Sequence, residues 1–335
     1  SSPRTTEGAP TIICPSSPAL RSTMSVTLPP DALDAYRRFS RFNSPYPAHD
    51  DGRAVDLYPA DGRGISPVAG VVRETRTVGC PDRSYAASED HLIVVDLDDD
   101  WCRRAGADPG TTARILHVIP EVSPGDRVAV GDDLGPTTRS GFFGQWVDDH
   151  VHLGFRAPGA SALRASGSLP VDVDVDVDPI QWDGEGVVVE RGPTHALLDA
   201  PRHPDPGETF AALASDEGVP LDGGLAHYAG GGAFDRDAVP DGDDAAAADP
   251  SARLDGGSPA TLWGTRVGVA SGRGLAWDPV DVLANGERVV GLSLFAARDA
   301  GYGAKVVCPD REFAVGDAVS LDVVPSDDPI RLGVG

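Results

Sequence analysis

Lysine is almost absent from the chain. Only Lys305 among the 28 basic residues is a lysine, whereas 42 of the 52 acidic residues are aspartates, and the formal net charge is −24. The lack of a basic stripe argues against nucleic acid as a partner. An acidic, lysine-poor composition resembles that of proteins from salt-accumulating halophiles, because dissolved salt screens the repulsion between like charges. The charge therefore indicates a saline environment more than a binding partner.

Long apolar runs are missing as well. No segment approaches the roughly 18 apolar residues that a membrane-spanning helix needs, so we expect no membrane span. Residues 1–7 lack the apolar core of a signal peptide. The localisation stays open between the cytoplasm and a protein that is exported, or incorporated into a virus particle, after processing.

Cysteine is scarce. The four cysteines lie at positions 14, 80, 102 and 308, with no C-x-x-C spacing, which argues against a cysteine zinc knot and a disulfide scaffold. Cys80 and Cys102 could form a disulfide, but we expect buried thiols.

Short strands punctuated by Gly and Pro are the dominant pattern. We expect strands at 70–75, 91–97, 113–119, 126–130, 146–155, 186–190, 196–198, 262–270, 288–297, 305–308 and 319–324. With 335 residues the chain is long enough for two domains. The predicted fold is mostly β: an antiparallel, sandwich- or barrel-like domain followed by a second β-rich domain.

Composition divides the chain into four parts. Residues 1–42 form an N-terminal extension with a short helix over 31–42, where Leu33, Tyr36 and Phe39 recur on one face. The remaining parts are a first domain (43–157), a linker with a Val-Asp strand (158–179, alternating over 171–178) and an accessory β-rich domain (180–335) with an acidic loop at 240–257. The alternating strand is expected to bury its valines and to expose a solvated acidic edge rather than a calcium site.

His150 and His152 lie two residues apart in an expected strand, so their imidazoles point to one face, about 6 to 7 Å apart. One imidazole can then bind a metal while the other faces substrate or water. For an isolated pair, the alternative is a solvated strand face.

Three further residues are candidate site residues by their residue type. His49 precedes Asp56 by seven residues, and the glycine turn between them allows an imidazole and a carboxylate to meet. The alternative is a surface histidine and a salt-bridged aspartate. His117 is surrounded by aliphatic residues, a setting that by itself is typical of a core histidine.

The order of these motifs resembles that of the lysostaphin/LytM-type zinc metallopeptidases, over residues 43–157. Each motif alone is common, whereas all five in order are fairly specific. The spacing of His49 and Asp56 departs from the four residues usual there and is similar to the His-x6-Asp loop of the related VanX/VanY-type D-Ala-D-Ala metallopeptidases. The matching segments are His49 with Asp56, Pro67-Val68-Ala69-Gly70-Val71-Val72, His117, Gly125-Asp126-Arg127-Val128-Ala129-Val130-Gly131-Asp132, and His150-Val151-His152.

The resemblance implies that His49, Asp56 and His152 bind Zn²⁺, and that His117 and His150 are catalytic histidines that do not bind it. Three protein ligands leave a fourth position for water, as in catalytic zinc sites. The expected function is hydrolysis of peptide bonds, with a short peptide or an envelope polymer as partner. The alternative is a non-catalytic binding or structural module of an envelope or virus-particle assembly. In residues 180–335 no catalytic motif is found, and the oligomeric state stays open.

Overall fold

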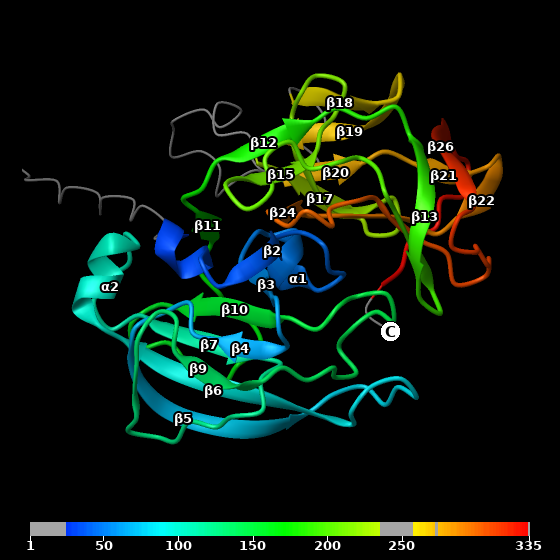
Figure 1. The fold of residues 1–335 in the computed structure, drawn as a ribbon. Helices are drawn as coiled ribbons and strands as arrows, with labels where there is room; N and C mark the ends of the chain where they lie inside the picture. The colour runs from blue at the N-terminus through cyan, green and yellow to red at the C-terminus, as the bar shows by residue number, and fades with distance from the viewer. Residues whose placement is uncertain (1–24, 235–256, 272–273, 334–335) are drawn as a thin grey trace, which may run out of the picture.

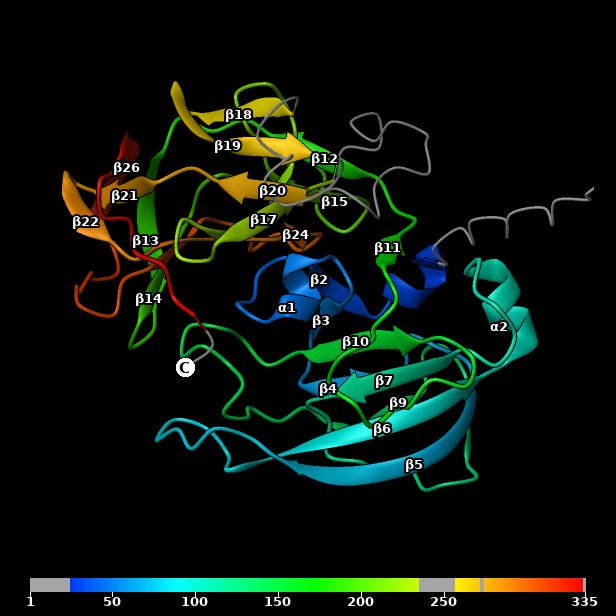
Figure 2. The ribbon, with the colours of Figure 1, turned by 180° about the vertical axis from the view of Figure 1, so that it is seen from behind.

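The computed structural model describes residues 25–234, 257–271 and 274–333. The described chain is mostly β, with two large sheets in two β-rich domains (Figures 1 and 2). Apart from two parallel pairs, β1 with β11 and β12 with β15, the named strands pair antiparallel. The expectation of a mostly antiparallel β protein with two β-rich domains is therefore confirmed.

The described part of the first half of the chain holds eleven strands, two short α-helices and one 3-10 turn. These elements are β1 (Val26–Leu28), the 3-10 turn (Pro30–Leu33), β2 (Tyr36–Ser40), α1 (Pro47–Asp50), β3 (Val55–Pro59), β4 (Arg63–Ile65), β5 (Gly70–Gly79), β6 (Glu89–Leu97), α2 (Asp99–Arg104), β7 (Thr112–Leu116), β8 (Arg127–Val128), β9 (Asp133–Pro136), β10 (Val151–Arg156) and β11 (Val171–Val173). The longer helix, α2, has six residues, and no helix in the described ranges could cross a bilayer.

The described part of the second half contains strands only. They are β12 (Val177–Ile180), β13 (Glu185–Arg191), β14 (His195–Leu198), β15 (Phe210–Leu213), β16 (Leu221–Leu225), β17 (Gly230–Ala233), β18 (Ser258–Leu262), β19 (Thr265–Ser271), β20 (Gly274–Trp277), β21 (Val280–Ala284), β22 (Glu287–Val289), β23 (Gly291–Leu294), β24 (Ala296–Ala297), β25 (Lys305–Val307) and β26 (Ala318–Pro325). The expected strand at 288–297 is thus three strands, and most of the predicted acidic loop lies outside the described residues.

One sheet joins the two halves of the chain. The ten-stranded sheet has the order β12-β15-β24-β2-β3-β10-β7-β6-β5-β8, so three strands of the second half extend it beyond β2. The junction is the pairing of β24 with β2, where Arg38 and Phe39 lie opposite Ala297 and Ala296. Because backbone hydrogen bonds continue across this junction, the two domains are tied together by more than side-chain packing.

The second sheet has twelve strands, in the order β18-β19-β20-β17-β16-β23-β25-β14-β13-β26-β21-β22. In Figure 1 it lies in the upper part of the molecule, where β12, β15 and β24 of the first sheet also lie, and α1 lies between it and the strands around β10.

The helix expected over 31–42 is wrong: the 3-10 turn is followed by strand β2. A bulge between Tyr36 and Arg38 interrupts the pairing of β2 with β3. An extra residue at a bulge shifts the strand's alternation, so Tyr36 and Phe39, three apart, are both buried. A three-residue spacing of apolar side chains, which normally indicates a helix, here comes from a bulged strand.

The Val-Asp run also differs from the single strand we expected. It forms two strands in different sheets, because β11 pairs with β1 while β12 joins the edge of the ten-stranded sheet beside β15. Val171 and Val173 are buried, as the alternation predicted. The three cysteines of the described chain, Cys80, Cys102 and Cys308, are free thiols.

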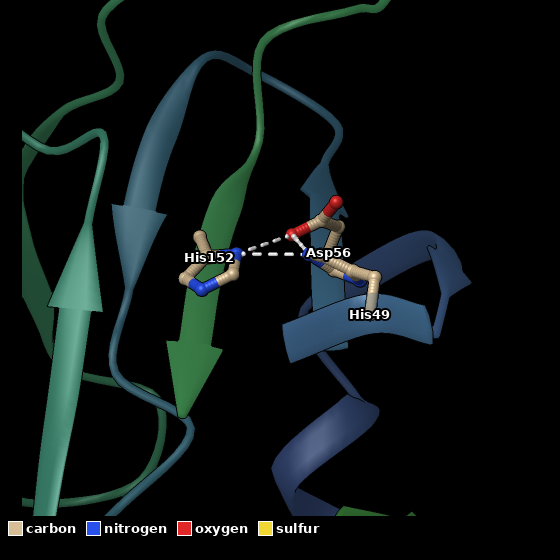
Figure 3. Close-up of side chains that lie close together, drawn as sticks. All are labelled: His49, Asp56 and His152. Carbon is tan, nitrogen blue, oxygen red and sulfur yellow. Dashed lines mark hydrogen bonds and ion pairs between the residues drawn. The ribbon is translucent and has the colours of Figure 1, made fainter. Parts of the chain in front are cut away.

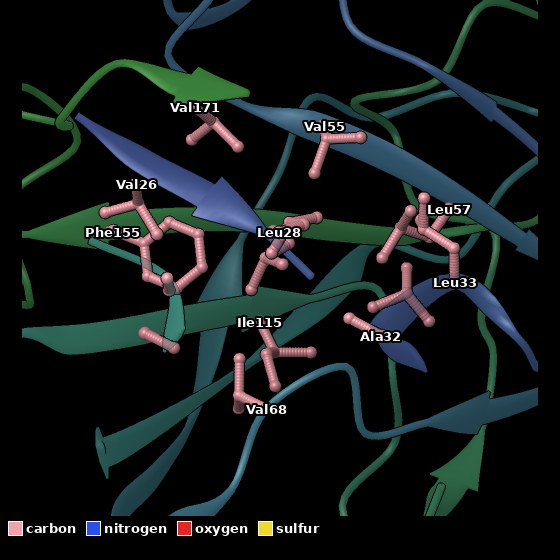
Figure 4. Packing of buried hydrophobic residues seen from close by; sticks show 14 of the residues in the cluster. Val26, Leu28, Ala32, Leu33, Val55, Leu57, Val68, Ile115, Phe155 and Val171 are labelled. Carbon is pink, nitrogen blue, oxygen red and sulfur yellow. The ribbon is translucent and has the colours of Figure 1, made fainter. Parts of the chain in front are cut away.

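The core of the first domain lies behind β10. Leu57, Ile115, Leu153 and Phe155 from three adjacent strands are fully buried together with residues of β1 and the 3-10 turn (Figure 4). The Trp101 ring of α2 stacks on Phe155 with ring centroids 5.6 Å apart. Burial of these side chains fixes the orientation of β10, so that the opposite face of the strand points toward the candidate site.

Candidate metal centre

Strand β10 presents His152 to a carboxylate on its neighbour. β10 pairs with β3 on one side and β7 on the other, and the register places His152 opposite both Asp56 and Leu116. Directly opposed side chains share one face of a sheet, with Cβ atoms about 5 Å apart. The His152 Nδ1 atom accordingly lies 2.9 Å from Asp56 Oδ1 (Figure 3). A register slip of one residue would turn His152 into the apolar core.

His49 reaches the same carboxylate from α1. Pro47 begins this single helical turn, and His49 lies in its last turn. The His49 Nδ1 atom lies 2.7 Å from the Arg41 carbonyl oxygen, to which it donates as Nδ1–H. Its Nε2 atom is 3.4 Å from Asp56 Oδ1 and 3.2 Å from His152 Nδ1. The imidazole is thus held in the tautomer that leaves Nε2 free as a ligand.

The three candidate ligand atoms lie close enough together to hold one metal ion. Zinc bonds to nitrogen and oxygen of about 2.0 to 2.2 Å, arranged tetrahedrally, place neighbouring ligand atoms about 3.3 to 3.6 Å apart. The contacts of His49 Nε2 with His152 Nδ1 and with Asp56 Oδ1 are close to this spacing, at 3.2 and 3.4 Å, whereas His152 Nδ1 lies at the hydrogen-bond distance of 2.9 Å from Asp56 Oδ1. These residues form the one group with metal-ligand spacing among the described residues. Two imidazoles and one carboxylate are donors that zinc accepts.

His150 borders this group. Its Nε2 atom is 3.4 Å from Asp56 Oδ1, and its Nδ1 atom is 2.9 Å from the backbone carbonyl of Asp148. The Phe143 ring stacks on the imidazole with centroids 4.4 Å apart. His150 therefore directs Nε2 toward the site, with its ring plane fixed by an aromatic neighbour and its tautomer by a carbonyl.

His117 follows the last residue of β7, with its ring centroid 5.0 Å from that of His150 and 5.7 Å from that of His152. Its backbone has φ of +69°, a left-handed conformation that is uncommon for a residue other than glycine. Such backbone strain persists where the surroundings impose it, and it is frequent at functional sites. The structure therefore brings all five predicted site residues together.

Asp90 was missed by the sequence analysis. This fully buried carboxylate lies 2.6 Å from His117 Nδ1 and accepts hydrogen bonds from the Ser140 hydroxyl and from the backbone N–H groups of His91 and His117. A carboxylate behind an imidazole orients the ring and increases its basicity. No local signal separates Asp90 from the other 41 aspartates, because its side-chain partners His117 and Ser140 lie 27 and 50 positions away in the sequence.

Burial and Asp56 set the charges of the site. Burial lowers the pKa of His150 and of His152, each to about 4. Burial also opposes protonation of His49, but the Asp56 carboxylate outweighs it and raises the pKa of His49. Burial would raise the pKa of Asp56, yet His150 and His49 hold it well below its usual range. His150 and His152 are therefore neutral at pH 7, the form that binds metal or accepts a proton.

Access to the group is narrow. His49, Asp56, His117 and His150 are all less than a tenth exposed, whereas the His152 side chain is 18% exposed. The half-buried rings of Tyr46 and Phe142 lie nearby, with centroids 5.9 Å apart and Phe142 6.4 Å from His117. A ligand would approach from the His152 side.

The three histidines of the C-terminal domain, His195, His203 and His227, lie outside the metal-binding group of the described residues. His203 Nε2 donates to the Ala297 carbonyl at 2.9 Å, and its Nδ1 accepts the N–H of Asp205. His227 is fully buried, with its ring 5.7 Å from Trp146 and 4.5 Å from Tyr228.

Comparison with known proteins places both halves of the chain in one family. No curated protein matches the chain. Residues 27–173 match a family model described as the N-terminal domain of DUF8155, a domain of unknown function, and residues 178–324 match the C-terminal domain of the same family. The two matches are consecutive and together cover most of the chain. The chain therefore belongs to the DUF8155 family, with both of that family's domains present.

Proposed function

We propose that the protein is a zinc-dependent hydrolase of peptide bonds, acting on short peptides or on an envelope polymer. The observation that carries the proposal is the convergence of one ligand atom each from His49, Asp56 and His152, beside two further imidazoles that are not needed as ligands. Structural zinc sites use four protein ligands, whereas catalytic sites keep one position open. The resemblance of residues 43–157 to the LytM-type metallopeptidases adds the reaction type.

His49 Nε2, Asp56 Oδ1 and His152 Nδ1 are the atoms that would hold the ion. Zinc, when bound, polarises a carbonyl oxygen and lowers the pKa of water toward neutrality. Because ligands must be deprotonated to bind, His49 has to lose the proton that Asp56 favours on it.

His117 is the better placed proton acceptor of the two remaining imidazoles. Its Nδ1–H donates to Asp90, so Nε2 can take the proton of the attacking water while the carboxylate stabilises the imidazolium. His150 has only a neutral carbonyl behind it, and burial lowers its pKa to about 4. In the proposal it orients the water and assists at the oxygen where charge develops.

A second candidate function is a non-catalytic binding or structural module. The near-complete burial of four of the five residues favours it, because a peptide would have to reach an ion that is largely enclosed. The two candidate functions predict the same metal content, but only the hydrolase is expected to cleave peptides.

The experiment combines metal analysis with a cleavage assay. Protein purified in molar KCl without added zinc is analysed by mass spectrometry and incubated with a peptide library, alongside Asp56→Asn, His150→Ala and the control His91→Ala. His91 lies on β6, outside the metal-binding group, and is half-buried. The enzyme proposal requires about one zinc per chain and cleavage by wild type and His91→Ala only. Stoichiometric zinc without cleavage would favour the binding module, and protein without zinc affinity would contradict both.

A further inference from the structure

The C-terminal domain reaches the site through two polar networks, one partly buried and one fully buried. The first contains the chain's single lysine, Lys305 on β25, which is 5% exposed. Its Nζ atom lies 3.0 Å from Asp148 Oδ1, and the Arg38 guanidinium binds Oδ2 of the same carboxylate. Burial opposes ionisation of Asp148, but the two cations hold its pKa below the ordinary value. The Asp148 carboxylate is therefore ionised and held by two cations, one from each domain.

This carboxylate belongs to the residue that orients His150. The backbone carbonyl of Asp148 accepts the Nδ1–H of His150 at 2.9 Å. Residues 147–150 lie outside the strands, just before β10 begins at Val151, so no backbone ladder fixes this carbonyl. Side chains anchor the segment in its place: Lys305 and Arg38 bind the Asp148 carboxylate, and Arg139 donates to the Val147 carbonyl.

The second network fixes His49. Asp222 on β16 is fully buried and accepts hydrogen bonds from the Ser40 hydroxyl at 2.5 Å and from the N–H groups of Arg41 and Phe42 at 2.6 and 3.2 Å. The carbonyl of Arg41 is the group that accepts the Nδ1–H of His49. In both networks, a charged side chain of the C-terminal domain binds the residue whose backbone carbonyl accepts the Nδ1–H of an imidazole.

We propose that Lys305 and Asp222 are positioning residues of the metal centre, through which the C-terminal domain sets the ring orientation and tautomer of His150 and His49. The inference rests on the proposed function for its kinetic consequences but not for its structural ones. Groups behind metal-site histidines typically change metal affinity or activity by about 10- to 100-fold when they are removed. The two networks should differ in outcome, because His49 is a proposed ligand and His150 is not.

Lys305→Met tests the first network, with Arg288→Met as the matched control. Arg288 forms an ion pair with Asp281 in the C-terminal domain, on β21 and β22. We expect Lys305→Met to keep its zinc affinity within about twofold while kcat falls about 10- to 100-fold and KM changes little. Arg288→Met should keep all three values. Equal kcat in Lys305→Met and wild type would overturn the positioning role.

A second variant covers the case in which Lys305→Met fails to fold because Asp148 is left with one partner fewer. The double variant Lys305→Met/Asp148→Asn removes both charges of the pair while leaving the carbonyl of residue 148 in place, and should show the same loss of kcat. A folded double variant with wild-type kcat contradicts the inference.

Asp222→Asn tests the second network by zinc affinity, measured in competition with a chelator. We expect a loss of about 10- to 100-fold, because the amide cannot accept all three hydrogen bonds and the Arg41 carbonyl is released. Unchanged zinc affinity, even with a lowered melting temperature, would show that Asp222 is merely structural.

A spectroscopic readout separates this inference from the proposed function. The chain has eight histidines, so ¹⁵N labelling of histidine alone gives ring spectra in which each tautomer is assigned from its long-range ¹H–¹⁵N correlations. In zinc-free wild type, at a pH high enough to make both rings neutral, His49 and His150 should each carry their one remaining proton on Nδ1. Lys305→Met should mix the tautomers of His150, and Asp222→Asn those of His49. If wild type cleaves no peptide but these changes occur, the positioning inference stands and the hydrolase proposal fails; single tautomers in both variants overturn the inference.

Discussion

The two domains bury histidine in different ways. In the N-terminal domain, His49, His150 and His152 surround Asp56, and His117 adjoins two of them, with ring centroids 5.0 to 5.7 Å apart for the contacting pairs. In the C-terminal domain, His203 is buried against a backbone carbonyl, and the buried His227 ring lies against Trp146 and Tyr228. Burial of a histidine therefore does not by itself make a site, whereas a strand register that opposes an imidazole and a carboxylate provides the start of one.

The strongest test of this contrast is removal of the shared carboxylate. Asp56→Ala deletes one of three proposed ligands and the only negative charge among them, so zinc affinity should fall by several orders of magnitude. His203→Ala in the other domain should keep its zinc. Mass spectrometry of the purified variants measures the metal directly, and full zinc occupancy in Asp56→Ala would remove the basis of the site.

The next largest effect concerns the two histidines that are not proposed ligands. His150→Ala and His117→Ala should each keep zinc and lose on the order of 10² to 10⁴ in rate, the usual contribution of a positioned acid–base group. The double variant should lose much less than the product of the two, because both groups act in one transition state. Peptide cleavage in molar KCl gives the rates. Loss of zinc from His150→Ala would show that the division of roles between His150 and His152 is wrong.

The link between the domains can be probed by pH through Asp222, whose pKa burial raises to about 6. From about pH 4 to 6 the folded state then binds this proton more tightly than the unfolded chain, so stability falls as pH rises. The shift corresponds to about 3 kcal/mol. Urea unfolding of zinc-free protein at pH 4.5 and pH 7 should show about 2 kcal/mol of this loss in wild type relative to Asp222→Asn, because the unfolded carboxyl is already mostly ionised at pH 4.5. Parallel pH profiles for the two proteins would contradict the assignment.

A smaller effect is expected from the carboxylate behind His117. Asp90→Asn keeps the size of the side chain but removes the charge that stabilises the imidazolium, and should lower the rate about 10- to 100-fold with zinc retained. Asp281→Asn, which lies in the ion pair with Arg288 of the C-terminal domain, is the control. Equal rates for Asp90→Asn and wild type would exclude a role for the carboxylate in proton transfer.

The smallest expected effect is the dependence of stability on salt, which both domains should share. At a net charge of −24, the folded chain repels itself, and salt relieves this as the Debye length shrinks from about 10 Å at 0.1 M to about 3 Å at 1 M. The melting temperature should therefore rise by several degrees between these KCl concentrations. Calorimetry would show it, and a flat melting temperature would argue against adaptation to high salt.

The sequence predicted the positions of strands better than which strands pair with each other. Expected strands at 91–97, 196–198 and 319–324 lie inside β6, β14 and β26 and match their ends to within two residues. The glycine-rich strands β16 and β17 gave no such signal. Glycine is needed there for close packing, since a Cβ at Gly231 would collide with the Trp277 ring, yet glycine is depleted from ordinary strands.

The sequence by itself determined the mostly β class and named five candidate residues, because alternation, turn residues and the order of motifs are local properties of the chain. Only the tertiary structure brought Asp90, Asp222 and Lys305 to the histidines that they support. It also decided that β24 extends the first sheet through β2. These contacts join residues from 27 to more than 250 positions apart. The physical reason is that hydrogen bonds and cross-strand pairs depend on which strands meet and in which register, and no local pattern specifies that choice.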